Sequence, residues 1–287
     1  MYITYNYLNT CNISEIEGIG SQYHKIITLY AVAKKNNIKY IHIPIPVGHN
    51  NDNDEKWNEK WDKQFNFEKL SNNNEIDIEN IEKEFLLDNA NFDYILENKD
   101  KNKLCFYFNT FTIFDENPDY YLRDILDDII NAYNENNNNR QLIYKKNKIN
   151  IAIHIRVFND NDTICENISS YISSDKNSSI RYYYTCEMYE KLINKLKNQY
   201  PNSEFHIFSQ EKYFDIKFKN LRNIKDINIH FNDLDLFDTF HHLCKSDVLV
   251  MGLSSLSIVA ALYNKNKIIY LPYSSPPYLK SWEVYKE

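Results

Sequence analysis

Residues 149–156 read INIAIHIR, a nearly continuous apolar run that ends in an arginine. Such a run is typical of a parallel β-strand that is buried on both faces of its sheet. Downstream, predicted helices and strands alternate: helix 183–200, strand 204–208, helix 212–218, strand 224–231, helix 234–244, strand 247–251, helix 254–263 and strand 267–271. This alternation predicts a doubly wound α/β domain. The segment 158–179 is polar and is expected to be a long loop.

The first half of the chain predicts a second α/β domain. Strands are expected at 2–8, 39–43 and 104–108, and helices at 23–35, 76–87 and 118–133, with Trp57 and Trp61 on one face of a further helix. An asparagine-rich run at 134–139 is the clearest linker in the chain. We therefore predict two Rossmann-like domains, residues 1–140 and 141–287, with a cleft between them.

Composition and charge exclude several classes of protein. The formal net charge is −7 and no block of Lys or Arg interrupts the chain, which argues against a nucleic-acid surface. No apolar run reaches 18 residues, so no membrane span is expected. The N-terminus has no signal-peptide pattern, so a cytoplasmic protein is expected. Heavy use of Asn, Ile, Lys and Tyr is typical of A/T-rich genomes, including those of large DNA viruses, for which the host cytoplasm would be the setting.

Metal and disulfide sites are not indicated either. The five cysteines are scattered and lack C-x-x-C spacing, so neither a zinc site nor a disulfide framework is predicted: Cys11, Cys105, Cys165, Cys186 and Cys244.

Glycine is rare, with 4 in the chain. A chain this poor in glycine is expected to keep it where the backbone turns sharply or approaches another group closely. Gly18 and Gly20 lie in the run GIGSQ, which ends at Ser21 and Gln22 and is predicted as a loop just ahead of a helix. The run lacks the third glycine of the dinucleotide fingerprint. It is consistent with a loop that approaches a ligand closely at a helix N-terminus, and also with a simple tight turn.

Three predicted strands in the second half are followed directly by residues suited to binding an anion. Because the carboxyl ends of parallel strands line the binding crevice of such a domain, these residues are expected to converge. They are His154 and Arg156, then Ser209, then Gly252, Ser254, Ser255 and Leu256.

Arg156 has two interpretations, and the functional one depends on the other two strand ends beside it. At the mouth of a parallel sheet, a guanidinium can donate two N–H groups to the oxygens of a diphosphate and stabilise charge that grows on a leaving group. The alternative is an arginine that extends from a strand end to a surface carboxylate. His154 lies two residues earlier, on the same sheet face, and fits a ligand contact and a buried core histidine equally well.

Ser254 and Ser255 open a predicted helix directly after a strand. Hydroxyl caps and free N–H groups at a helix N-terminus form an anion site. Plain capping of the helix is the alternative, and both roles can hold together. The chain lacks G-x-S-x-G, which disfavours a nucleophilic serine.

The motifs, taken in order, resemble those of the fucosyltransferase superfamily. The run from Gly18 to Gln22 resembles the G-x-G-N-Q opening of α1,2-fucosyltransferases and protein O-fucosyltransferases, and HIR at 154–156 resembles their H-x-R motif and the H-x-R-R of α1,6-fucosyltransferases. The residues DVLV at 247–250 with Ser254 and Ser255 resemble the last motif of the superfamily, and Ser209 ends a strand at the place of a similar F-S. Order and spacing agree from residue 18 to about 271.

The resemblance implies a GT-B-like glycosyltransferase that inverts the anomeric centre and needs no metal. Residues 141–287 would bind GDP-fucose, and residues 1–140 would help to bind a glycan or glycoprotein acceptor. Arg156 would hold the donor diphosphate with support from His154, and the nucleotide pocket would be lined by Ser254, Ser255 and Leu256.

The chain also departs from the superfamily pattern. Ser21 stands where the family has Asn, Val157 replaces the second arginine of H-x-R-R, and Gln210 and Glu211 replace acidic residues. Two alternatives therefore stay open: an enzyme that uses another nucleotide sugar, such as a UDP- or dTDP-sugar, and a non-catalytic relic that binds a glycan or nucleotide. The candidates for a general base are Asp160, Asp162 and Glu211.

Overall fold

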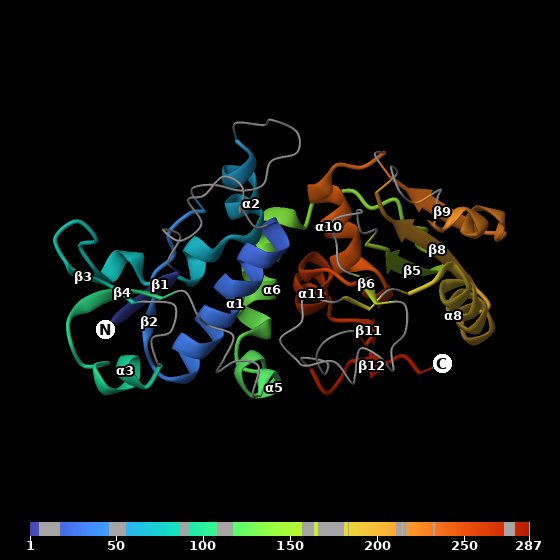
Figure 1. The fold of residues 1–287 in the computed structure, drawn as a ribbon. Helices are drawn as coiled ribbons and strands as arrows, with labels where there is room; N and C mark the ends of the chain where they lie inside the picture. The colour runs from blue at the N-terminus through green and yellow to red at the C-terminus, as the bar shows by residue number, and fades with distance from the viewer. Residues whose placement is uncertain are drawn as a thin grey trace. The chain divides into compact units, whose positions relative to one another are not determined.

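The computed structural model describes residues 1–5, 18–45, 56–86, 92–107, 117–156, 164–165, 181–182, 184–210, 214, 217–231, 233–272 and 279–286. The chain divides into two compact units, Met1–Asn139 (unit 1) and Arg140–Glu287 (unit 2), and each is built on a parallel sheet (Figure 1). None of the described helices combines the length and apolar character that crossing a membrane requires.

Unit 1 contains a four-stranded sheet in the order β2-β1-β4-β3, with every neighbouring pair parallel. Its strands are β1 (Tyr2–Tyr5), β2 (Lys39–Tyr40), β3 (Glu82–Phe85) and β4 (Lys103–Tyr107). Its helices are α1 (Ile19–Lys35), α2 (Trp57–Phe65), α3 (Phe92–Glu97), α5 (Pro118–Leu122) and α6 (Leu126–Asn137), with 3-10 turns η3 (Phe67–Leu70) and η4 (Asn73–Glu75).

Aromatic side chains form much of the core of unit 1. Trp57 and Trp61 lie one turn apart on α2, as their spacing predicts, and their ring centroids are 5.9 Å apart. Trp61 is fully buried and stacks on Phe65, which in turn stacks on Tyr23 of α1. The two tryptophans are therefore core residues that join α2 to the rest of the unit.

Three predictions for unit 1 were wrong. Residues 76–87 were expected to be a helix, but the described part contains a turn and then β3. The reason is local: the Asp77 carboxylate accepts hydrogen bonds from the N–H groups of Glu79 and Asn80, which competes with helix formation. The helix expected at 118–133 is broken into α5 and α6, and the expected linker at 134–139 continues α6 as far as Asn137.

Unit 2 contains a six-stranded sheet in the order β12-β11-β10-β5-β8-β9, and every neighbouring pair is parallel. Its strands are β5 (Ile149–His154), β8 (Ser203–Phe208), β9 (Ile227–His230), β10 (Val248–Val250), β11 (Lys267–Tyr270) and β12 (Glu283–Val284). The other elements are α8 (Cys186–Gln199), η5 (Lys219–Asn223), α10 (Leu236–Lys245), α11 (Ser255–Tyr263) and a separate pair of strands, β6 (Ile164–Cys165) and β7 (Arg181–Tyr182).

Taken in chain order, the strands of this sheet are arranged third, second, first, fourth, fifth, sixth. This is the doubly wound order, in which the chain leaves the first strand in one direction and later returns to its other side. The prediction of a doubly wound α/β fold for the second half is thus confirmed. The order reverses between β5 and β10, so the sheet has its topological switch point there.

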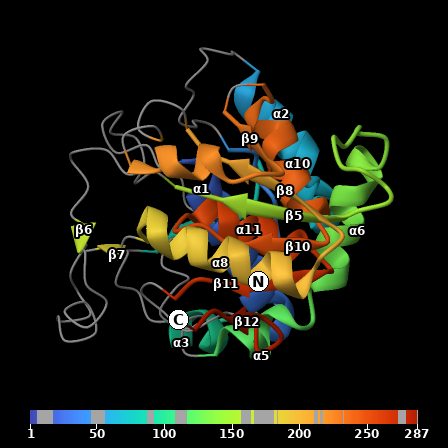
Figure 2. The same cartoon turned by 90° about the vertical axis from the view of Figure 1, so that its right-hand side faces the viewer.

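Helices cover both faces of the sheet (Figures 1 and 2). Ile151 and Ile153 of β5 pack in one cluster with Leu192 and Ile193 of α8. On the opposite face, His154 contacts α11. Because alternate residues of a strand point to opposite faces, the run INIAIHIR is apolar on one face and carries Asn150 and His154 on the other.

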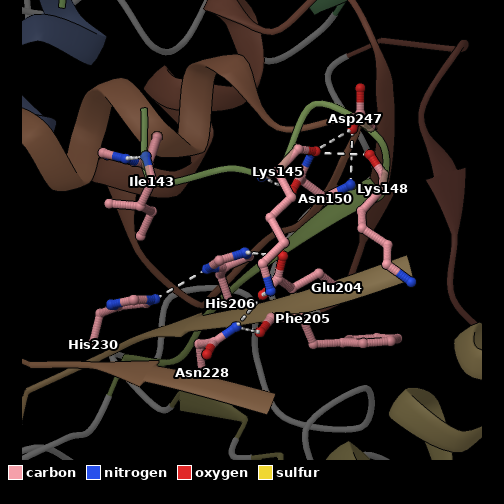
Figure 3. A network of polar contacts seen from close by, with 11 residues as sticks. Ile143, Lys145, Lys148, Asn150, Glu204, Phe205, His206, Asn228, His230 and Asp247 are labelled. Carbon is pink, nitrogen blue, oxygen red and sulfur yellow. Dashed lines mark hydrogen bonds and ion pairs between the residues drawn. The ribbon is translucent and has the colours of Figure 1, made fainter. Parts of the chain in front are cut away.

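A polar network fastens the amino ends of the central strands (Figure 3). The Asn150 N–H donates to Asp247 Oδ2 at 2.8 Å, which ties β5 to the start of β10. Lys145 pairs with Glu204 of β8 at 2.7 Å. These contacts fix the segment that enters β5, and they lie at the end of the sheet opposite to Arg156.

The C-terminal segment adds an element that the sequence pattern did not predict. The backbone of Glu283–Val284 pairs with β11 as β12, the edge strand of the unit 2 sheet. Three of the described cysteines are not in disulfide bonds: Cys105, Cys186 and Cys244.

Candidate functional site

The carboxyl ends of β5 and β10 lie next to each other at the switch point of unit 2. A Cβ atom added to Gly252, just after β10, would lie 2.4 Å from the backbone oxygen of His154 and 3.0 Å from its Nδ1. No side chain fits at that distance, so the close approach of the two strand ends requires glycine. In doubly wound sheets, the crevice outside such a pair of ends is the place where ligands bind.

His154 is the last residue of β5 and lies at this pair of strand ends. Its Nδ1 lies 2.7 Å from the hydroxyl of Ser257 on α11, and its side chain is buried. Burial, and then the nearby Arg156 guanidinium, lower the pKa of His154 to about 4. The ring is therefore neutral at pH 7, as the core-histidine alternative expects. It also lies next to Arg156 at the strand end where a ligand is expected, so its position is consistent with a ligand contact as well.

Arg156 follows β5 by two residues and is half-buried. Its Nη1 donates to Gln210 Oε1 at 3.4 Å, the long end of hydrogen-bond distances. Gln210 belongs to the segment after β8, whose Ser209 hydroxyl donates to the Ile155 oxygen at 2.8 Å. The guanidinium thus contacts the segment that follows the neighbouring strand, at the carboxyl edge of the sheet.

Ser254 caps α11. Its Oγ accepts a hydrogen bond from the Leu256 N–H at 3.3 Å, and its backbone oxygen accepts from the Ile258 N–H. The capping alternative is therefore realised for Ser254. The helix has nine residues and its N-terminus faces the end of β10, so the positive end of its dipole lies at the same edge of the sheet. Ser255 and Leu256 form its first turn and are half-buried.

The structure thus brings together seven of the residues predicted for the site, all at the carboxyl edge of unit 2: His154, Arg156, Ser209, Gly252, Ser254, Ser255 and Leu256. The other four belong to unit 1: Gly18, Gly20, Ser21 and Gln22.

The prediction that these four residues form a loop was wrong, because α1 begins at Ile19. Gly18 is the N-cap, with φ −62° and ψ 154°, and its oxygen accepts from the Ser21 N–H at 2.9 Å and the Gln22 N–H at 3.2 Å. A Cβ at Gly18 would meet no atom within 4 Å. Glycine is therefore not required there by close approach of the described residues, unlike at Gly252.

Ser257 was missed by sequence reasoning, although its hydroxyl contacts both sides of the switch point. The available signal was a single polar residue, Ser257, among the apolar residues at 256–262 of the predicted helix. The candidate bases Asp160, Asp162 and Glu211, and Val157 as well, lie outside the described residues. Within the described ranges, no group of three or more His, Cys, Asp or Glu side chains is placed to hold a metal ion, and metal independence stays a prediction.

No protein-family model matches this chain, and no curated protein matches it significantly. The chain is similar to solved structures of POFUT1, a protein O-fucosyltransferase. A crystal structure of POFUT1 in complex with GDP-fucose gives a TM-score of 0.46 at 10% identity, over 94% of this chain and 97% of that one. The apo form gives 0.42 at 11% identity over 94% and 97%, and a complex with GDP gives 0.42 at 11% over 94% and 98%. At these values the similarity assigns no activity to this chain.

Proposed function

We propose that this protein is an inverting, metal-independent glycosyltransferase that transfers fucose from GDP-fucose to a hydroxyl of a glycan or glycoprotein. One observation carries the proposal. An arginine and a helix N-terminus lie on adjacent strand ends at the switch point of a doubly wound sheet, where only glycine lets the strands approach. That arrangement suits a diphosphate, which the leaving group of a nucleotide sugar supplies.

The proposal gives each residue a physical role. The Arg156 guanidinium donates to the diphosphate oxygens, with a gain of ~1.5–3 kcal/mol for a charge-assisted hydrogen bond. Its effect on the rate exceeds this if the contact tightens as negative charge develops on the leaving group. The first turn of α11, with Ser254 and Ser255, offers N–H groups and a positive dipole end to the same anion.

Fucose and guanosine come from the motif resemblance and not from the geometry. The runs that begin at Gly18, His154 and Asp247 occur in the order of the fucosyltransferase motifs. By that resemblance, residues 141–287 bind the donor and residues 1–140 contribute to acceptor binding.

A thermal-shift panel tests the donor assignment. The protein is heated with GDP, GDP-fucose, GDP-mannose, UDP and UDP-sugars, each with and without Mg²⁺. A ligand at 100 times its dissociation constant stabilises the fold by ~2.7 kcal/mol, or roughly 5–10 °C for a unit of this size. Selective stabilisation by GDP and GDP-fucose without Mg²⁺ is the expected result. No response to any nucleotide refutes the donor site.

A second candidate function is a binding protein that has lost catalysis, and Ser21 is the observation that favours it. The superfamily places Asn at this position at the start of α1. A relic binds GDP-fucose but releases no GDP when a panel of glycan and glycoprotein acceptors is added, whereas the enzyme releases GDP with at least one of them. Stabilisation by UDP-sugars alone indicates instead an enzyme with another donor.

A further inference from the structure

Ser257 joins the two strand ends at the switch point. Its side chain is completely buried in the first turns of α11. The Gly252 N–H donates to its Oγ at 2.9 Å, and the same Oγ lies 2.7 Å from His154 Nδ1. One hydroxyl therefore contacts Gly252, two residues after β10, and His154, the last residue of β5, which lies 103 positions away from Ser257 in the chain.

The chemistry of this hydroxyl determines where the protons lie. A backbone amide only donates, so Oγ is the acceptor toward Gly252 and its single proton is free for another partner. Among the described residues, His154 Nδ1 is the acceptor that lies within hydrogen-bond distance of this proton. The hydroxyl then donates to Nδ1, and a neutral imidazole in this position carries its own proton on Nε2.

We propose that Ser257 is a positioning residue of the donor site: it holds His154 as the neutral Nε2–H tautomer, so that the ring presents a hydrogen-bond donor beside Arg156. The ligand of that donor is the diphosphate of a nucleotide sugar, and to this extent the inference rests on the proposed function. A ring with this proton arrangement has no free lone pair, so His154 is not the general base of the reaction.

The charges around His154 agree with this assignment. Burial and the Arg156 guanidinium both disfavour the imidazolium form, so the ring meets the ligand without a positive charge of its own. Two neighbouring cations would repel each other, whereas a neutral donor and a guanidinium can bind the same anion together. The Ser257 hydroxyl accepts a hydrogen bond from the Gly252 amide and donates one to His154, and this relay fixes the ring in one tautomer.

NMR of the wild-type protein labelled with ¹⁵N at histidine tests the tautomer directly. The His154 signals are assigned by their loss in His154→Gln. At pH 7 we expect an unprotonated Nδ1 and a protonated Nε2. A protonated Nδ1 overturns the inference, whether or not any nucleotide binds. If the Nε2–H tautomer is found but GDP does not bind, the proposed function fails and the positioning of His154 by Ser257 stands.

Matched serine variants test the link to ligand binding. Ser257→Ala removes the relay, and Ser203→Ala removes a half-buried hydroxyl at the amino end of β8, away from the candidate site. We expect Ser257→Ala to lose the fixed tautomer of His154 and to weaken GDP binding about tenfold, the effect of one hydrogen bond of ordinary strength. Ser203→Ala should retain both the tautomer and the wild-type GDP affinity. A Ser257→Ala protein that keeps both the wild-type tautomer and the wild-type GDP affinity contradicts the inference.

Discussion

Replacement of Gly252 by alanine tests the geometry on which the candidate site depends. The new Cβ would lie 2.4 Å from the His154 oxygen, whereas ordinary contacts of this kind begin at 3.4 Å. The two groups must therefore separate by about 1 Å, the difference between these distances. The obstructing atom belongs to the backbone of β5, which is paired with β8 through His154 and Phe208. The methyl group cannot be accommodated by rotation of a side chain.

The cost follows from this rigidity. Overpacking costs typically 1–3 kcal/mol, and a backbone obstruction places Gly252→Ala near ~3 kcal/mol. Loss of backbone freedom in the unfolded chain offsets this by ~0.4–1 kcal/mol. We expect a net destabilisation of ~2–2.6 kcal/mol, or a decrease in Tm of roughly 4–10 °C for a unit of this size.

Gly18→Ala is the matched control. An alanine Cβ there meets no atom within 4 Å, and φ is −62°, which any residue adopts. Its free energy of unfolding should stay within ~0.5 kcal/mol of wild type, the range of an ordinary surface substitution. Urea unfolding, followed by tryptophan fluorescence and circular dichroism, measures both variants. A Gly252→Ala protein as stable as Gly18→Ala would refute the close approach of β5 and β10.

Three further predictions concern stability. Four buried histidines have pKa values lowered to about 4 or about 3, mainly by burial: His24, His154, His206 and His241. Histidines of the unfolded chain bind protons near pH 6.5, so the free energy of unfolding falls as the pH decreases from 6.5 toward 4. For the three rings of unit 2 the decrease is ~4 kcal/mol per pH unit. Urea unfolding at pH 7 and pH 5 measures this decrease, and equal stabilities at the two pH values contradict the burial of these rings. Ser254→Ala should cost ~1 kcal/mol through the lost cap of α11, in contrast to Ser255→Ala, as measured by Tm. Trp61→Ala should cost ~3–5 kcal/mol in chemical denaturation, because its ring is fully buried in unit 1; a cost below 1 kcal/mol contradicts its place in the core.

The fold of unit 2 was predictable because its signals are regular. The run INIAIHIR has the composition of a strand buried on both faces, and the alternation that follows it leaves one fold class. The start of α1 was not predictable to the residue, since an extended glycine cap has no side chain that marks it. At 76–87, the spacing of apolar residues favoured a helix, but the Asp77 carboxylate forms a turn instead. The apolar residues Ile76, Ile78 and Ile81 of this segment pack against the sheet without forming a helix.

The candidate site was predictable only in part, because a local pattern marks the ends of strands but not contacts between distant segments. Arg156 and Gly252 stand at strand ends that the pattern itself marks. Ser257 is not marked by the pattern, because its role depends on contact with His154, 103 residues away. That contact depends in turn on the order of the strands in the sheet. The sequence pattern predicts five strands of the unit 2 sheet, from β5 to β11, but it does not say which strands are neighbours.

The most direct test of the central claim is calorimetric titration of GDP-fucose into the wild-type protein and into two arginine variants of unit 2. Arg156→Ala removes the guanidinium at the switch point. Arg140→Ala removes the same charge from a partly buried ion pair with Asp238 and serves as the control. The account predicts binding to wild type and Arg140→Ala and a loss of at least tenfold in affinity for Arg156→Ala, the effect of one charge-assisted hydrogen bond. Equal affinity in all three proteins, or no binding to the wild type, would contradict it.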